Sequence, residues 1–508
     1  MSCKTDRVTA TLLSACPLLR EAFLRVRYDA DSLLNALGDS AHAALGRSEP
    51  VPVRLASRDL GELGTLVRLF LLVDDIEETD AALALSPLTV QHALDASIVS
   101  RSGPGVVRAL VDIRPLDTGS GTRWVVSDLD GSMRDAPTAP DHVLGVGQAS
   151  LSLLRGTPTA PAEAVLDVGT GCGVQAVHAA GYARSVTATD ISPRSMMLAA
   201  ATAALNELSV ELLQGSWFEP VAGRTFDRIV ANPPFVVGLG TVDHSYRDSG
   251  LDLDGASQLM VQHAPDHLAF GGIAAILASW VHIDGEDWRS RVASWLPDHG
   301  IDAWIVQRDV ADPALYVGTW LRDGGVDPRT GSGADRAQAW LEHFSDSDVT
   351  GIGFGFVYLR KTDAPTDVLA EDLRHAFDDP LGNEAMDYFD RVSFLRENEP
   401  SQTVFHLDPN TALERVYLPG DEGWASTVTR VHRGDGPNWQ HEVDDLGAAL
   451  LAGMSPGGLA LTDLVELLAA AHGVDEDELL DASLDLVVAL HRHGLLHPAS
   501  TRRADGQP

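Results

Sequence analysis

Four apolar, β-rich runs, each followed by turn residues, most constrain what this chain can fold into. They are VLDVGTGCG (165–173), VTATD (186–190), GSWFEP (215–220) and FDRIVANPPF (226–235). Sequence typical of helices fills two of the gaps between them. This alternation predicts a parallel α/β sheet, whose functional residues gather at the carboxyl ends of the strands. We therefore expect the site among the residues that end these runs.

The first two runs predict a site for a ligand that carries a ribose. Gly169, Gly171 and Gly173 follow the first strand, and without a Cβ they permit a tight turn and close approach of a ligand. The spacing differs from the dinucleotide motif, and no P-loop lysine follows. Asp190 ends the next strand, where a carboxylate can accept hydrogen bonds from both ribose hydroxyls. The glycines alone could form a plain turn, whereas together with Asp190 they indicate binding.

The fourth run ends in Asn232-Pro233-Pro234-Phe235. Pro233 moves Asn232 out of the helical conformation, and the two prolines remove two N–H donors, so this turn offers only acceptors. The Asn232 side-chain oxygen and the Pro233 carbonyl suit a planar NH2 group, and a flat substrate can stack on Phe235. An isolated tetrapeptide of this kind would be read as a strand-ending turn. At this position in the α/β pattern we interpret it as catalytic.

Together these motifs resemble the class I S-adenosylmethionine (SAM)-dependent N-methyltransferases with the Asn-Pro-Pro-aromatic motif, or methyltransferase small domain. The resemblance covers residues 145–361 and implies a Rossmann-like, seven-stranded domain. It implies that Asn232 binds the target nitrogen, that Asp190 holds the ribose and that Trp217 lies by the adenine. The SAM-binding residues that follow from it are Asp167, Gly169, Thr170, Gly171, Gly173, Asp190, Ile191, Ser216 and Trp217.

The substrate stays open between two classes. Release-factor glutamine methyltransferases share the GSWFEP-like run but typically carry Tyr where this chain has Phe235, and a different continuation follows. Enzymes that methylate exocyclic amines of adenine or guanine in RNA or DNA use Phe, Tyr or Trp there. We expect a protein glutamine amide, with a nucleobase amine as the alternative and a catalytically silent scaffold as a third hypothesis. Tyr246, Arg247 and Gln148 are candidate substrate contacts, and in related enzymes the segment that contains Gln148 closes over the cofactor.

Composition narrows the partners. The net charge of −36 over 508 residues argues against a large nucleic-acid-binding face, although an acidic surface for solubility explains it as well. The sequence has no apolar run long enough to span a membrane. The three cysteines are too few and scattered for a disulfide framework or a Cys-based metal site, and His491, His493 and His497 lack further ligands. We expect no metal, no membrane and a cytoplasmic protein, and the oligomeric state is not predicted.

Three domains are expected. Residues 1–134 predict a helical, winged-helix-like module in which Asp31 caps a helix and two strands (106–113 and 123–127) form a hairpin. Residues 142–361 form the methyltransferase domain, and residues 366–500 form an α+β module with a winged-helix-like end. Linkers are expected at 135–141 and 361–365. Neither flanking module has a basic face, so we expect the N-terminal module to serve substrate docking or dimerisation and the C-terminal module to bind a protein or peptide rather than nucleic acid. The aromatic residues of an insertion at 309–346, Trp320, Trp340 and Phe344, are expected to form a local core.

Overall fold

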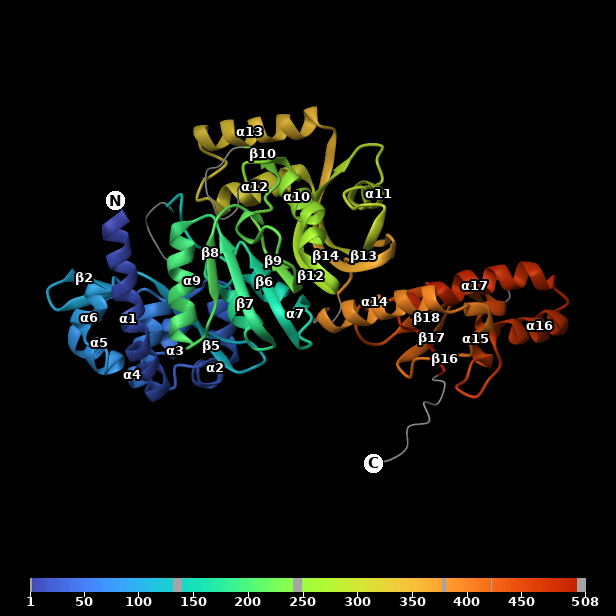
Figure 1. Cartoon of the computed structure of the whole chain (residues 1–508), viewed down its shortest axis with the longest axis horizontal. Helices are drawn as coiled ribbons and strands as arrows, with labels where there is room; N and C mark the ends of the chain where they lie inside the picture. The colour runs from blue at the N-terminus through green and yellow to red at the C-terminus, as the bar shows by residue number, and fades with distance from the viewer. Residues whose placement is uncertain (1, 131–138, 241–248, 377–380, 422, 500–508) are drawn as a thin grey trace. The chain divides into compact units, whose positions relative to one another are not determined.

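The computed structural model describes residues 2–130, 139–240, 249–376, 381–421 and 423–499, with the side chains described from residue 8 onward. The chain divides into two compact units. The first comprises residues 1–154 and 159–374, and the second comprises residues 155–158 and 375–508. Figure 1 shows the elements of both units. Each unit is described by itself below.

An eight-stranded sheet forms the centre of the first unit, with the strand order β15-β13-β14-β12-β9-β6-β7-β8. All neighbouring pairs are parallel except those of β14, which is antiparallel to both β12 and β13. The strands are β6 (Ala162–Val168), β7 (Ala183–Asp190), β8 (Glu211–Gln214), β9 (Phe226–Ala231), β12 (Leu268–Ile283), β13 (His299–Ala311), β14 (Val349–Pro365) and β15 (Asp367–Asp372). Helix α7 (Gln148–Gly156) precedes β6, and the strands are followed by α8 (Val174–Ala179), α9 (Pro193–Leu205), α10 (Gly255–His263) and α11 (Trp288–Ala293).

The central strands are apolar because helices cover both faces of the sheet. Val165, Leu166 and Val168 of β6 are buried, as are Ile229 and Val230 of β9. Continuous apolar runs of this kind are typical of parallel strands that are buried on both sides. The expected mixed α/β fold with a Rossmann-like sheet is confirmed by this topology.

The edge of the sheet differs from the expectation. The seven expected strands are present, but β15 adds an eighth that pairs in parallel with β13, from Asp302↔Asp367 to Gln307↔Asp372. The linker expected at residues 361–365 is wrong, because these residues continue β14. Its polar residues and Pro365 suggested a linker, but strand ends and edge strands tolerate both, since part of their backbone needs no partner.

The N-terminal part of the first unit contains six helices and five strands in the described residues 2–130. They are α1 (Ser2–Val26), α2 (Ala30–Gly46), α3 (Pro50–Ala56), α4 (Gly61–Leu66) with a π-helical extension (Val67–Leu71), β1 (Ile76–Glu77), α5 (Glu78–Leu85), α6 (Val90–Asp95), β2 (Val99–Gly103), β3 (Val106–Ala109), β4 (Asp112–Asp117) and β5 (Thr122–Ser127). The succession from α4 to β3, with the sheet order β1-β3-β2, is the topology of a winged helix.

Two local expectations in this part are corrected. The strand expected at 106–113 is two strands, β3 and β4, which belong to different sheets, because the chain turns between them. The cap of α2 is Asp29 rather than Asp31, since the Asp29 carboxylate accepts a hydrogen bond from the Ser32 N–H at 2.7 Å. Asp31 lies in the first turn of the helix, where an acidic residue also favours the helix dipole. Most of the linker expected at 135–141 lies outside the described residues.

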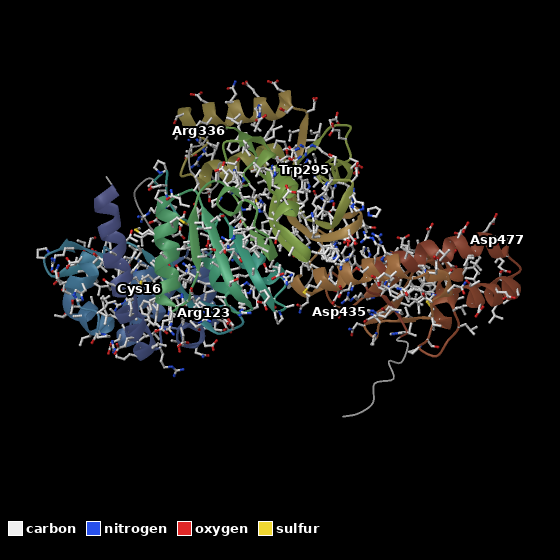
Figure 2. All side chains as sticks on the ribbon, in the orientation of Figure 1. Cys16, Arg123, Trp295, Arg336, Asp435 and Asp477 are labelled. Carbon is white, nitrogen blue, oxygen red and sulfur yellow. The ribbon has the colours of Figure 1, made fainter. Side chains whose placement is uncertain are left out.

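The N-terminal elements pack directly on α9, and the two parts share one hydrophobic core (Figure 1). Asn206, which caps α9, bonds to both backbone groups of Trp124 on β5, at 3.0 Å and 2.7 Å. Cys16 of α1, labelled in Figure 2, donates its thiol hydrogen to the Ala201 carbonyl of α9 at 3.6 Å. The eight-stranded sheet and its helices therefore do not stand free of the N-terminal elements.

An insertion between β13 and β14 forms a helical pair, α12 (Pro313–Asp323) and α13 (Gly331–Asp346), that lies near β10 (Gly238–Leu239) (Figure 1). Trp340 and Phe344 are buried in a local cluster and Trp320 packs against it, as expected. The same cluster includes Val236 and Val237, which follow the Asn-Pro-Pro-Phe turn. The short strand β11 (Asp252–Leu253) pairs with β10. Figure 2 labels Arg336 on α13.

The second unit is a smaller α+β body. Its elements are α14 (Gly382–Glu397), β16 (Phe405–Leu407), β17 (Thr411–Gly420), β18 (Gly423–Arg433), β19 (Gln440–Glu442), α15 (Asp445–Gly453), α16 (Leu461–His472), α17 (Glu476–Arg492) and β20 (Leu496–Pro498). The three final helices and the short last strand were expected, and β20 pairs with β16. Over the described part of the chain, the helices are all too short or too polar to cross a membrane.

Candidate functional site

A cavity of about 440 Å³ lies at the carboxyl ends of the central strands. This volume falls within the range of small-molecule and cofactor sites. The wall takes residues from the segments that follow β6, β7, β8 and β9 and from the segment that leads into α7. The expected site residues in the wall are Gln148, Gly169, Thr170, Gly171, Asp190, Ile191, Ser216, Trp217, Asn232 and Pro234.

The turn after β6 is fixed by the acid that ends β7. Asp190 accepts hydrogen bonds from the Gly171 N–H at 2.9 Å and the Ser192 N–H at 2.8 Å. Gly169 and Gly171 have φ values of 72° and 55°, a conformation that favours glycine. Burial raises the pKa of Asp190, and its backbone hydrogen bonds act in the opposite direction. The result is a turn that presents backbone to the cavity beside a carboxylate that can accept further hydrogen bonds.

Two of the residues expected to bind the cofactor, Asp167 and Gly173, support this turn. The described cavity wall does not include Asp167 or Gly173. Asp167 accepts hydrogen bonds from the Thr170 hydroxyl at 2.5 Å and the Ala176 N–H at 3.0 Å, and burial raises its pKa to about 7. Gly173 begins α8 with a φ of 82°, and a Cβ there would lie 3.2 Å from the Ala199 Cα. Asp167 thus ties the turn to α8, and Gly173 lets α8 pack closely on α9.

The Asn-Pro-Pro-Phe turn meets the glycine turn at the cavity. Asn232 and Pro234 belong to the wall, whereas Pro233 is buried and Phe235 is half-buried. A Cβ added to Gly169 would lie 3.9 Å from the Pro233 Cα, so a side chain at position 169 would touch the Asn-Pro-Pro-Phe turn. The Phe235 carbonyl accepts a hydrogen bond from the Ser279 hydroxyl of β12 at 2.5 Å. Asn232 therefore faces the same space as the glycine turn.

Trp217 adopts an unusual backbone conformation in the cavity wall. Its φ is 47°, which a bulky side chain adopts rarely and at a cost of about 1 to 2 kcal/mol. Its carbonyl accepts a hydrogen bond from the Thr189 hydroxyl at 3.4 Å, and its ring packs partly on the sheet core. Ile191, 62% exposed, lies at the rim. Trp217 and Ile191 together offer apolar surface for a flat ring.

Several wall residues escaped the sequence analysis. His142, Val143, Leu144 and Gly145 come from the segment before α7, and Gln175 comes from α8. This segment has no apolar periodicity, and only its glycines (145 and 147), just before an amphipathic helix, could have suggested a ligand loop. Nothing in the sequence indicated that Gln175 lines the cavity, because a polar residue near the start of a helix usually faces solvent.

The segment before α7 is anchored by an ion pair that crosses from the N-terminal part to α9. Asp128 binds the Arg194 guanidinium in a close ion pair, accepts from the Val143 N–H at 2.9 Å and lies 3.7 Å from the His142 ring. Burial alone would raise the pKa of Asp128, but the hydrogen bond and charge of Arg194 lower it. This wall of the cavity thus depends on Asp128.

The remaining expectations concern residues that this structure does not place or does not test. Tyr246 and Arg247, the candidate substrate contacts, lie outside the described residues. Over the described chain, no group of three or more His, Cys, Asp or Glu side chains is arranged to bind a metal ion.

Three regions of the chain match known families. Residues 144–281 match the methyltransferase small domain. Residues 25–110 and 386–498 match two domains of unknown function, DUF7059 and DUF7782. The first match covers the glycine turn, Asp190 and the Asn-Pro-Pro-Phe turn, so it coincides with the cavity.

Relatives of two kinds share this region. A release factor glutamine methyltransferase of Aliivibrio fischeri is 29% identical over 180 residues, which are 32% of this chain and 61% of that protein. A ribosomal RNA small subunit methyltransferase C of Erwinia tasmaniensis is 34% identical over 117 residues, or 23% of this chain and 31% of that protein. The chain thus spans less than two thirds of either relative.

Among solved structures, a 16S rRNA methyltransferase (RsmC) from T. thermophilus, in complex with AdoMet and guanosine, matches with 17% identity and a TM-score of 0.27. The match covers 43% of this chain and 58% of that one. A TM-score this low carries no further argument.

Proposed function

Because residues 144–281 form a SAM-dependent methyltransferase domain, we propose that this protein methylates a planar NH2 nitrogen, that of a glutamine side-chain amide in a protein. The observation that carries the proposal is the position of Asn232. Its side chain lines the same cavity as the glycine turn and Asp190. A methyl donor in the cavity would therefore lie next to an amide oxygen that can accept hydrogen bonds from an NH2 group.

The residues of the cavity fit SAM. Gly169 and Gly171 leave room for the donor's methionine part, where a Cβ would narrow the cavity. Asp190 lines the cavity, and its carboxylate can accept hydrogen bonds from the ribose hydroxyls. Trp217 and Ile191 provide apolar surface beside Ser216 for the adenine. When bound, SAM supplies a methyl group on a positively charged sulfur, which is already activated for transfer.

The chain's own residues would orient and stabilise the substrate. The Asn232 oxygen and the Pro233 carbonyl would accept the two N–H hydrogens and aim the nitrogen at the methyl group. The same oxygens would stabilise the positive charge that develops on the nitrogen. The nitrogen becomes acidic as it accepts the methyl group, so transfer needs no dedicated base in the wall.

The charge around the cavity favours a protein over a nucleic acid. The described wall contains neither Lys nor Arg. Among these described wall residues, the one carboxylate is that of Asp190 and the one imidazole is that of His142. The neighbouring insertion, residues 309–346, has three Arg and seven Asp or Glu, a net charge of −4. Nucleic-acid affinity depends largely on cationic contacts to phosphates. A glutamine side chain on a protein needs no such contacts.

A nucleobase amine is the second candidate. It is supported by Phe235, whose half-buried ring follows Asn232 directly and could stack on a base, and by the ribosomal RNA relatives. Both candidates share the geometry at Asn232. They differ only in what surrounds the NH2 group.

The two candidate functions are distinguished by whether protein or RNA receives the labelled methyl group. The purified protein would receive methyl-labelled SAM with either total RNA or a protein extract free of ribosomes, followed by mass spectrometry of the products. Asn232→Ala tests the site, and Asn398→Ala, an exposed asparagine of the second unit, is the matched control. Label in a protein glutamine, lost in Asn232→Ala and kept in Asn398→Ala, supports the proposal. Label in RNA supports the second candidate. No label in either fraction, while the protein still binds S-adenosylhomocysteine, contradicts both.

A further inference from the structure

The backbone of Val237, two residues after the Asn-Pro-Pro-Phe turn, is held by two aromatic side chains of the insertion. Its N–H donates to the Tyr316 hydroxyl at 2.6 Å. Its carbonyl accepts from the Trp340 indole N–H at 3.2 Å. Tyr316 belongs to α12 and Trp340 to α13, so the two helices of the insertion meet at one backbone residue.

Both aromatic side chains are almost fully buried, with 2% of Tyr316 and 8% of Trp340 exposed. Their rings pack edge to face, with centroids 6.1 Å apart. A buried hydroxyl or indole N–H without a hydrogen-bond partner would lower the stability of the folded state. In a purely apolar core, Phe or Leu at these positions would therefore be more stable than Tyr or Trp. Here the polar atom of each ring serves a hydrogen bond to Val237.

The neighbouring backbone is fixed as well. The Phe235 carbonyl accepts from the Ser279 hydroxyl of β12, and Pro233 and Pro234 have fixed φ angles. From Asn232 to Val237 the chain is therefore stiff at its start through proline and anchored at its end through three side chains. The flexible part of the turn is the Asn232 side chain itself.

We propose that Tyr316 and Trp340 are positioning residues for methyl transfer, which set the place of Asn232 by clamping Val237. This inference rests on the proposed function. In-line transfer depends steeply on geometry, and a displacement of about 1 Å can cost roughly a hundred-fold in rate. Neither side chain belongs to the described cavity wall, so both act through the backbone rather than on the substrate or cofactor.

The test compares two tyrosines that each lose only a hydroxyl. Tyr316→Phe removes the hydrogen bond to Val237 and keeps the ring. Tyr182→Phe is the matched control, because this buried hydroxyl in the same unit has no hydrogen-bond partner among the described residues. The measurements are kcat and KM for the methyl acceptor, the dissociation constant of S-adenosylhomocysteine, and hydrogen–deuterium exchange of a peptide spanning residues 234–240.

In Tyr316→Phe we expect kcat to fall about ten-fold, as for one hydrogen bond lost with its donor left buried. The dissociation constant of S-adenosylhomocysteine should stay within two-fold, exchange in 234–240 should quicken, and Tyr182→Phe should match the parent protein. Trp340→Phe, which removes the other hydrogen bond to Val237, should likewise lower kcat and quicken exchange in residues 234–240.

Unchanged exchange in Tyr316→Phe overturns the clamp. Faster exchange with an unchanged kcat overturns the positioning role, because the turn would then keep its geometry without the clamp. A fall in S-adenosylhomocysteine affinity equal to the fall in kcat would also overturn it and indicate general damage to the domain. If the parent protein transfers no methyl group at all, the proposed function fails, and the exchange measurement still decides whether the clamp exists.

Discussion

Replacing Asp190 by asparagine tests whether this carboxylate binds the cofactor's ribose. Asp190 accepts two backbone hydrogen bonds, one from the Gly171 N–H in the glycine turn and one from the Ser192 N–H in the segment that leads into α9. An asparagine keeps one oxygen as an acceptor and has an NH2 donor in place of the other. This NH2 group would face either one of the two backbone N–H groups or a ribose hydroxyl of the cofactor. In both cases at least one charge-assisted hydrogen bond is lost.

The size of the effect follows from that loss. A hydrogen bond to a charged group contributes about 1.5 to 3 kcal/mol. Losing one, together with some disorder of the glycine turn, should weaken S-adenosylhomocysteine binding by about 2 to 3 kcal/mol, or roughly 30- to 150-fold in the dissociation constant.

Asp227→Asn provides a matched control. Asp227 also accepts hydrogen bonds from two backbone N–H groups, those of Glu163 at 3.0 Å and Ala164 at 2.9 Å. It lies at the amino ends of the strands, opposite the cavity, because it begins β9 and pairs with the start of β6. Isothermal titration calorimetry with S-adenosylhomocysteine should show the large change only in Asp190→Asn. Equal losses in both variants, or a loss below three-fold in Asp190→Asn, would refute the reasoning.

The pH dependence provides a second check on the same residue. Burial raises the pKa of Asp190, so the carboxyl group of the free protein takes up a proton at a higher pH than an exposed aspartate does. A protonated carboxyl group has fewer acceptor sites, so S-adenosylhomocysteine affinity should fall as the pH is lowered through that pKa. Asp190→Asn should show a flatter pH profile.

Three further predictions concern stability. Gly173→Ala should destabilise the protein by about 1 to 3 kcal/mol more than Gly223→Ala in thermal unfolding, because both have a left-handed φ (82° and 74°) but only Gly173 faces the backbone of α9. Burial raises the pKa of Asp167 from 3.8 to about 7, so unfolding releases its proton and the free energy of unfolding should fall as the pH rises between these values, a trend that urea titrations should find missing in Asp167→Asn. Asn206→Ala should cost about 2 to 4 kcal/mol in urea unfolding, since it leaves both backbone groups of Trp124 buried without their partner, whereas a smaller cost would mean that water replaces the side chain.

The sequence was sufficient to predict that three segments at strand ends meet at one cavity. The glycine turn, Asp190 and the Asn-Pro-Pro-Phe turn each follow an apolar run directly, and parallel strands bring such ends together. The distinction between Asp167 and Asp190 could not be predicted. Both are acids at strand ends, and only the packing shows that Asp167 turns towards Thr170 and α8 while Asp190 reaches the cavity.

The wall before α7 was beyond prediction for a different reason. His142 and Val143 are placed by Asp128, which lies in the N-terminal part of the chain, and by Arg194 on α9. Asp128 and Val143 are 15 residues apart in the sequence, and Asp128 and Arg194 are 66 apart. Neither residue stands in a periodic pattern that could have revealed the pairing. The eighth strand was missed likewise, because only pairing with β13 makes residues 367–372 a strand.

These long-range contacts give the N-terminal part a role in the site. Helix α9 begins just after Asp190, and its core-facing residues Leu198, Ala201 and Leu205 are buried in the hydrophobic cluster that the N-terminal helices also form. The ion pair of Asp128 with Arg194 links that cluster to the cavity wall. The N-terminal part, residues 2–130, therefore packs directly on the elements that carry the cavity. Through Asp128, which lies beyond the DUF7059 match at 25–110, and through α9 it supports two walls of the cavity, so changes in its packing should reach the cofactor site without touching a cofactor contact.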